Sequence, residues 1–392
     1  MKRSVLISIF FLILSSACSE KRNVPPTPIP DGVLIQEIPP QMDIIFDSIR
    51  YILNDRACLD ENYEVDKNFM NLPGCNALIY GAQEEGLASP RQLFAMDIES
   101  GAVVQITNTD CFFILGQVVD STTLMTLAIC YDTDANGNIN DKDKPELFFL
   151  DLATGEMDCL TCGYNLVSIN NSDYSQVNKS IVFSAQPSTE FHNYLFSIDA
   201  NKNLIQITHQ AEYMDFDCSW SEDGTKIVFS RLPAPWFTKP SQVWLMESDG
   251  TYLEKITDGG PNPDNEGNFG AYPIGIDADP DLSPDNKRIV ISRLKTGYRN
   301  VPFGVYELII VDVDTKEVEI LDSQFANMMP QWKSRGILVI RQVGAANADE
   351  INAMNIKQSL SVYRDGHFEE LEDYPCNVFP LGAFGGYWIE LD

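Results

Sequence analysis

The feature that most constrains this sequence is a pair of strands, joined by a tight turn, that recurs along the chain. In residues 217–230 a short strand ends at Trp220, a Glu-Asp-Gly turn follows, and an alternating strand runs through Lys-Ile-Val-Phe-Ser. Residues 281–292 repeat this shape with Leu282 in the place of Trp220, and residues 330–340 form a looser copy. Such self-similarity fixes the architecture before any single motif does.

A second half-repeat follows each copy and is the more regular of the two: a strand, a turn, and a strand ending near Ile-Thr. Its six copies are residues 92–107, 146–161, 194–208, 243–257, 307–321 and 359–372. The spacing is that of a four-stranded propeller blade, and one blade cannot bury both of its faces alone. We therefore predict an all-β fold, a six-bladed β-propeller of four-stranded antiparallel blades over residues 75–392. A β-sandwich explains neither the count nor the paired half-repeats.

The run Ser-Trp-Ser-Glu-Asp-Gly-Thr-Lys-Ile-Val-Phe-Ser, followed further on by Leu-Glu-Lys-Ile-Thr, resembles the repeat of TolB-like β-propellers. The resemblance covers about residues 75–372 and is strong only in the fourth and fifth repeats. It implies a six-bladed propeller in a secreted bacterial protein. It does not identify a ligand, because this fold serves many functions.

The N-terminus predicts a lipid-anchored, secreted protein. Residues 1–17 combine a short basic region with an apolar run too short to span a bilayer comfortably. The segment Leu-Ser-Ser-Ala-Cys that ends at Cys18 resembles a bacterial lipoprotein signal, which implies cleavage before Cys18 and lipidation of its thiol; Ser15 stands where Leu is usual. An ordinary secretory signal is the alternative. Ser19 is not the Asp that retains such lipoproteins at the inner membrane, so the resemblance favours the outer membrane, on either of its faces.

The predicted propeller is preceded by a Pro-rich tether, residues 18–32, and by residues 33–74, which we expect to pack on the propeller or close it. The charge excludes one class of partner, since 57 acidic against 27 basic residues give a formal net charge of −30. Nucleic-acid phosphates require a basic surface, so we expect no nucleic acid partner. Contact with an anionic membrane is expected through the lipid anchor only, and the oligomeric state stays open.

The cysteines that follow Cys18 belong to a chain bound for an oxidising compartment, so disulfides are expected. Cys111 and Cys130 bracket a predicted hairpin, which places them opposite each other on adjacent strands. Cys159 and Cys162 have a spacing that can close on itself. A redox-active pair is the alternative interpretation of these two, although no thioredoxin-like βαβ context surrounds them. The cysteines whose pairing stays open are Cys58, Cys75, Cys218 and Cys376.

One stretch has a specific metal chemistry. Residues 132–143, Asp-Thr-Asp-Ala-Asn-Gly-Asn-Ile-Asn-Asp-Lys-Asp, match the calcium-loop pattern, with oxygen ligands at alternate positions, Gly137 at the sixth and an acid at the twelfth. The predicted ligands are Asp132, Asp134, Asn136, Asn138 through its carbonyl, Asn140 through water, and Asp143. The flanks are predicted strands, so we expect a structural calcium loop without EF-hand helices. A hydrated polar turn is the alternative.

Catalytic signatures are missing from the sequence: it has no Gly-x-Ser-x-Gly elbow, no Gly-rich phosphate loop and no shared histidine motif. The long connections are all predicted on one face of the disc, and long loops on a rigid scaffold commonly carry binding sites. The aromatic binding-face candidates in these loops are Trp236, Phe237, Phe269, Tyr272, Tyr298 and Phe303. Packing over the blade below is the alternative role of each ring. We therefore expect a non-catalytic binding or scaffold module for a protein or glycan, with a carbohydrate-active lyase or hydrolase as the alternative.

Overall fold

The computed structural model of the chain describes fewer residues than the sequence contains. They are residues 76–82, 92–97, 103–105, 107–120, 123–139, 143–151, 154–235, 239–260, 276–296, 305–323, 326–333, 336–343, 357–370 and 384–390. The predictions for the signal peptide, the tether and residues 33–74 lie outside this set, as do those for Cys18, Cys58, Cys75 and Cys376. Within it, no helix is long and apolar enough to cross a membrane. The chain divides into two compact units, Met1–Gly163 with Pro375–Asp392, and Tyr164–Tyr374.

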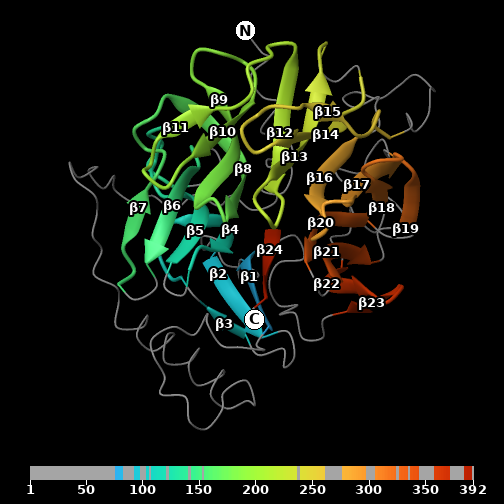
Figure 1. Cartoon of the computed structure of the whole chain (residues 1–392). Helices are drawn as coiled ribbons and strands as arrows, with labels where there is room; N and C mark the ends of the chain where they lie inside the picture. Colours follow the sequence, from blue (N-terminus) through green and yellow to red (C-terminus); the bar gives the residue numbers. More distant parts are fainter. Residues whose placement is uncertain are drawn as a thin grey trace. The chain divides into compact units, whose positions relative to one another are not determined.

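The first unit contains two four-stranded antiparallel sheets, with strand orders β24-β1-β2-β3 and β4-β5-β6-β7 (Figure 1). Their strands are β1 (Asn76–Ala82), β2 (Gln92–Asp97), β3 (Val103–Gln105), β4 (Phe112–Val118), β5 (Thr123–Ile129), β6 (Glu146–Asp151), β7 (Met157–Cys159) and β24 (Phe384–Glu390). Strand β24 pairs with β1, so that Ala77 lies opposite Ile389. The end of the chain therefore completes the sheet that the first repeat begins, which sequence analysis did not foresee.

The second unit contains four sheets of the same kind, and in each of them spatial order follows chain order. Their strands are β8 (Leu166–Ser175), β9 (Ser180–Pro187), β10 (Tyr194–Ile198), β11 (Leu204–Gln206), β12 (Tyr213–Trp220), β13 (Lys226–Pro233), β14 (Gln242–Glu247), β15 (Glu254–Lys255), β16 (Asp277–Leu282), β17 (Arg288–Thr296), β18 (Val305–Asp312), β19 (Val318–Asp322), β20 (Ala326–Lys333), β21 (Gly336–Val343), β22 (Lys357–Arg364) and β23 (His367–Glu370).

The predicted repeats match these sheets strand for strand. The strand pairs that first defined the repeat are β12–β13, β16–β17 and β20–β21. The six regular half-repeats are β2–β3, β6–β7, β10–β11, β14–β15, β18–β19 and β22–β23. Each sheet of the described chain is therefore one four-stranded antiparallel propeller blade, and the all-β prediction is confirmed.

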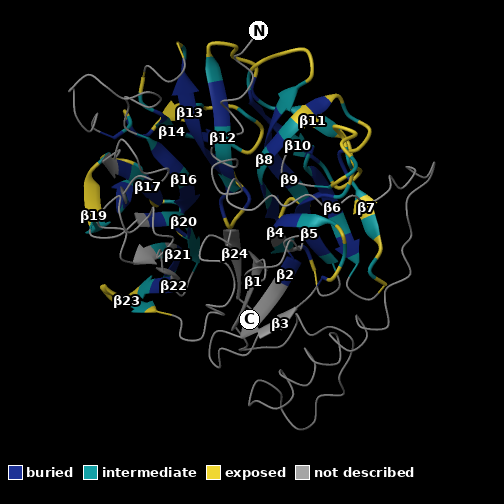
Figure 2. Ribbon diagram, turned by 180° about the vertical axis from the view of Figure 1, so that it is seen from behind, coloured by how far each residue is buried: buried dark blue, intermediate teal, exposed yellow. Residues whose placement is uncertain are grey.

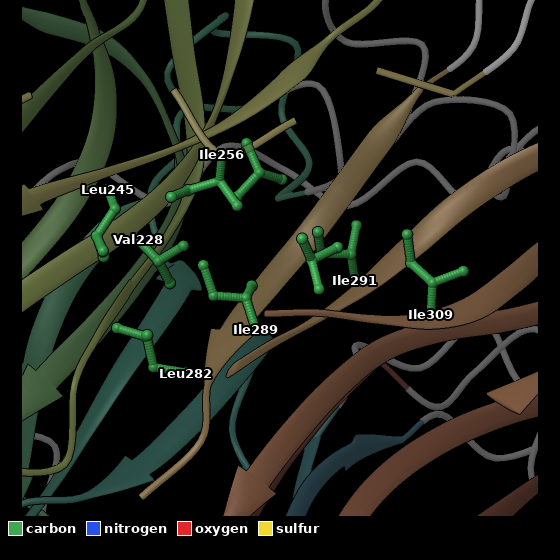
Figure 3. Close-up of a cluster of buried hydrophobic side chains, with 9 residues drawn as sticks. Val228, Leu245, Ile256, Leu282, Ile289, Ile291 and Ile309 are labelled. Atoms are coloured by element: carbon green, nitrogen blue, oxygen red, sulfur yellow. The ribbon is translucent and has the colours of Figure 1, made fainter. Parts of the chain in front are cut away.

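The second strand of a blade is buried on both of its faces, which explains its uninterrupted apolar run. In β17, Ile289 and Ile291 pack with Val228 of the preceding sheet (Figure 3). Between them, Val290 points to the other face and packs with Val339 of the following sheet. All of these side chains are at most 2% exposed, and full burial of each contributes about 1.5–3 kcal/mol. The core of this unit thus lies between successive sheets.

The fourth strand is the exposed edge of its blade. Val318 and Ile320 of β19 are 48% and 57% exposed, whereas the side chains of β13 are almost all buried (Figure 2). The last strand, β19, is therefore far more accessible than a second strand such as β13.

Candidate functional site

The predicted calcium loop connects β5 to β6, two strands of one sheet, without any flanking helix. It brings Asp132, Asp134 and Asp143 together, with one carboxylate oxygen of each lying within 4.8 Å of the others. Asp143, at the twelfth position, is buried. Three convergent carboxylates are the oxygen-only donor set that calcium prefers, so the residues present fit that ion.

Backbone amides hold these carboxylates in place. Asp132 accepts hydrogen bonds from the amides of Asn136 at 3.0 Å and Gly137 at 2.7 Å. Asp143 Oδ1 accepts from the Thr133 amide at 2.7 Å and from the Asp134 amide at 3.1 Å. Gly137 has a φ of +87°, and a Cβ there would meet nothing within 4 Å, so glycine is needed for the backbone bend and not for space.

Two further predicted ligands in this loop are asparagines, Asn136 and Asn138. The Asn136 side-chain oxygen accepts a hydrogen bond from the Asn138 amide at 2.9 Å, within the same turn. Asn138 is exposed. The sixth predicted ligand, Asn140, lies outside the described residues.

Both predicted disulfides are present in the structure. Cys111 immediately precedes β4 and Cys130 immediately follows β5, and their Cα atoms are 4.4 Å apart across the hairpin. Cys159 is bonded to Cys162. Among the described cysteines, Cys218 is free and buried.

Trp236, Phe237, Phe269, Tyr272, Tyr298 and Phe303 all lie outside the described residues.

A group of acidic residues on the first strands of the second unit was missed by sequence reasoning. Asp217 of β12, Asp279 of β16 and Met329 of β20 occupy equivalent places, each with a positive φ close to +50°. At each place the pairing with the next strand shifts register, so the three strands carry the same β-bulge. A bulge re-aims side chains, which is why strict alternation does not show where these residues point.

These carboxylates link one sheet to the next. Asp279 accepts a hydrogen bond from the Met329 amide at 3.1 Å, and Asp217 accepts a longer one, 3.4 Å, from the Asp279 amide. Two residues beyond Asp279 in β16, Asp281 accepts a hydrogen bond from the Trp332 amide of β20 at 2.6 Å. In the β8 sheet, Asp173 accepts from the Trp220 amide, also at 2.6 Å.

Ser219 connects two of these acids. Its hydroxyl lies 2.6 Å from Asp281 Oδ1 and 3.2 Å from Asp173 Oδ2. A hydroxyl has one hydrogen, so both contacts are hydrogen bonds only when one of the two carboxyl groups is protonated. Burial raises the pKa of Asp281 to about 6, which favours that proton.

The Asp217 and Asp279 carboxyl groups show the same tendency. Burial raises the pKa of Asp279 to about 6. Burial, and next the negative charge of Asp279, raise the pKa of Asp217 well above its usual value. The arrangement can hold protons near neutral pH, as two neighbouring carboxylates do when they cannot both ionise.

Charged pairs recur at the other end of these first strands. Arg231 makes two hydrogen bonds to Asp215, at 2.6 and 2.8 Å, and both side chains are 1% exposed. Arg293 forms the same bidentate pair with Asp277, at 2.7 and 2.8 Å. The sequence carries a signal for both: each arginine directly follows a serine in the second strand of its sheet and lies opposite its Asp in the first strand.

No protein-family model and no curated protein sequence matches this chain significantly. Solved structures do resemble it. TolB from Acinetobacter baumannii has a TM-score of 0.55 at 16% identity, over 80% of this chain and 66% of the TolB chain. A chain of a nidogen/laminin complex has a TM-score of 0.52 at 7% identity, over 81% of this chain and 99% of that chain.

Hydrazine synthase from Kuenenia stuttgartiensis also resembles this chain, with a TM-score of 0.54 at 11% identity, over 80% of this chain and 47% of that chain. The chain thus spans just under two thirds of the TolB chain and about half of the hydrazine synthase chain. At such identities the likeness shows the fold alone: a TolB-like β-propeller of four-stranded antiparallel blades.

Proposed function

We propose that this protein is a lipoprotein of the bacterial cell envelope, anchored by Cys18, with the outer membrane favoured. In this proposal its blades close as one six-bladed ring, which acts as a non-catalytic binding or scaffold module for a protein or glycan. The observation that supports the binding role is the likeness to a TolB propeller over 80% of the chain. The lipid anchor rests on the sequence that ends at Cys18. A further similar structure comes from a complex of two proteins, nidogen and laminin.

The hydrogen bonding of the acidic residues on the first strands supports a structural role for them. Asp173, Asp279 and Asp281 each accept a hydrogen bond from a backbone amide of the next sheet. A carboxylate occupied in this way stabilises the contact between blades. Binding would then fall to the long loops, where rigid scaffolds commonly place it.

A carbohydrate-active enzyme is the second candidate, and one observation favours it. Carboxyl groups from neighbouring sheets meet on the first strands, and their pKa values are raised toward the range useful for general acid catalysis. In that case Asp279 and Asp281 would be the acids of the site.

One experiment separates the two candidates. The intact lipidated protein is used to capture partners from envelope extracts, and each captured protein or glycan is then purified and titrated against it. The proposal expects saturable binding with the partner recovered unchanged. Turnover of a captured glycan that Asp279→Asn abolishes would overturn the proposal in favour of the enzyme.

We also propose a structural calcium ion in the loop between β5 and β6. The side chains of Asp132, Asp134, Asn136 and Asp143 would hold it, with the Asn138 carbonyl and a water near Asn140. A bound ion would reduce the repulsion among three adjacent carboxylates and fix a loop that starts beside the Cys111–Cys130 disulfide.

The lipid anchor has its own test. Cys18→Ala should leave the protein uncleaved or release it from the membrane fraction, because the acyl chains that make attachment stable are added to that thiol. A Ser19→Ala variant, which keeps the cysteine, serves as the matched control. If Cys18→Ala fractionates with membranes exactly as the native protein does and is cleaved normally, the anchor lies elsewhere.

A further inference from the structure

The Cys159–Cys162 disulfide lies where another molecule can reach it. Cys159 is the last residue of β7, the outer strand of its sheet, and Cys162 follows three residues later. Cys162 is exposed and Cys159 is half-buried. Cys162 is therefore the more accessible of the two cysteines to a thiol of a partner.

The backbone distinguishes the two sulfur atoms. The Cys162 amide donates a hydrogen bond of 3.1 Å to Cys159 Sγ. A donor at this distance stabilises negative charge on that sulfur once the disulfide opens. Cys159 is therefore the better leaving group and Cys162 the sulfur that an incoming thiolate attacks.

A buried carboxylate lies beside the pair. One oxygen of Glu146 and the two sulfur atoms all lie within 4.8 Å of one another, although Glu146 is only 5% exposed. Thr161 donates a hydrogen bond of 2.5 Å to Glu146 Oε2, and Lys144 Nζ lies 2.5 Å from Oε1. These contacts fix the position of the Glu146 carboxylate beside the disulfide.

We propose that Cys159–Cys162 is a redox-active disulfide that oxidises dithiols of a partner protein or peptide, with Glu146 moving the proton. A substrate thiolate attacks Cys162 Sγ, the bond between the two cysteines breaks, and its electron pair leaves on Cys159. A mixed disulfide now joins Cys162 to the substrate. The second substrate thiol gives its proton to Glu146 and attacks the substrate sulfur. Cys162 leaves, and the substrate disulfide and the reduced cysteine pair are the products.

This activity goes beyond the proposed binding role and does not depend on it. It uses only residues of the first unit, whereas the aromatic binding candidates all belong to the second. The Cys111–Cys130 disulfide provides an internal comparison. It joins the ends of two directly paired strands, with a separation of 19 residues, and so has the position of a structural crosslink.

The test uses the intact protein in glutathione buffers with graded ratios of reduced to oxidised glutathione. Acid quenching, alkylation and peptide mass spectrometry then report the thiol content of each pair. We expect Cys159–Cys162 to pass reversibly between dithiol and disulfide in this range, with an unchanged circular dichroism spectrum, while Cys111–Cys130 stays oxidised. Equal resistance of both pairs, or reduction only together with unfolding, would refute the proposal.

Two variants test the role of Glu146, with a reduced dithiol peptide as the probe. Glu146→Gln should slow oxidation of the peptide and flatten its dependence on pH, while the glutathione equilibrium of the pair stays close to the native one. Glu156→Gln, an exposed acid in the preceding turn, should match the native protein. Identical rates in both variants would remove Glu146 from the proposal. Tight zinc binding by the reduced protein, lost in Glu146→Gln, would make the cluster a metal site instead.

Discussion

The Asp281 carboxylate accepts a hydrogen bond from the Trp332 backbone amide, 2.6 Å away in the next sheet. Asp173 of β8 makes the same contact with the Trp220 amide of β12. Each is a charge-assisted link between the first strands of neighbouring sheets. Burial of Asp281 disfavours its charged form. Contacts that hold blades together in this unit are therefore sensitive to protonation.

The first prediction concerns stability against pH. Burial raises the pKa of Asp281 from its ordinary value of 3.8 to about 6 in the folded chain. The folded state therefore binds this proton more tightly than the unfolded state does. Stability from this group is fully present below about pH 4 and falls as pH rises to about 6, by at most roughly 3 kcal/mol. Asp281→Asn should flatten this part of the curve and raise the urea midpoint at pH 7, with little change at pH 4.

The matched control for this variant is Asp285→Asn, in the turn that follows the same strand. Hydrogen bonds from Ser283 and from the Lys287 amide lower the pKa of this exposed acid, so neutralising it should give no gain at pH 7. If Asp281→Asn lost stability at pH 7 and kept the native pH slope, burial would not raise the pKa of Asp281 in the fold, and its assigned role would be wrong.

The second prediction concerns the buried Arg231–Asp215 pair. Arg231→Met leaves a buried Asp215 without its partner and should destabilise the fold by about 3–5 kcal/mol, measured by urea unfolding. The double variant Arg231→Met/Asp215→Leu should recover much of that loss, because no isolated charge stays buried. Arg364→Ala breaks the exposed pair with Glu369 and should cost less than about 1 kcal/mol. Equal losses for the buried and exposed pairs would contradict this account.

The third prediction concerns calcium. A ligand bound only by the folded state stabilises it by about 2.7 kcal/mol at a hundredfold excess over Kd. Chelator should therefore lower the melting temperature of the native protein, and Asp132→Ala/Asp134→Ala should abolish that dependence. Asp314→Ala, an exposed acid in the turn after β18, should respond to chelator as the native protein does. If prolonged treatment with chelator left the melting temperature of the native protein unchanged, the loop would be a hydrated turn.

Much of the fold was predictable, because blade strands have strong local signals. Lys-Ile-Val-Phe-Ser and Arg-Ile-Val-Ile-Ser are apolar at successive positions since β13 and β17 are buried on both faces. The turn glycine Gly224 takes a φ of +69°, as its place in Glu-Asp-Gly suggested. The Cys111–Cys130 crosslink followed from the hairpin that its cysteines bracket.

The positions of the acidic residues on the first strands, such as Asp217 and Asp279, were not predictable in the same way. The bulges at Asp217 and Asp279 break the alternation from which side-chain direction is inferred. Their hydrogen-bond partners lie in another sheet, about fifty to sixty residues away in the sequence. Only the packing between blades brings these residues together. The closing strand β24 likewise lacks the repeat motif, and only its pairing with β1 identifies it.

The central claim, that this propeller binds through its long-loop face, is tested most directly by the affinity of a purified, captured partner for two variants. Trp236→Ala/Phe237→Ala should weaken binding by at least about 30-fold with an unchanged melting temperature, because aromatic anchors often contribute 2 kcal/mol or more each. Glu222→Lys, in the exposed tight turn between β12 and β13, should leave the Kd nearly unaltered. Binding lost through Glu222→Lys and insensitive to the aromatic pair would contradict the claim, as would a sharp fall in the melting temperature of the aromatic variant.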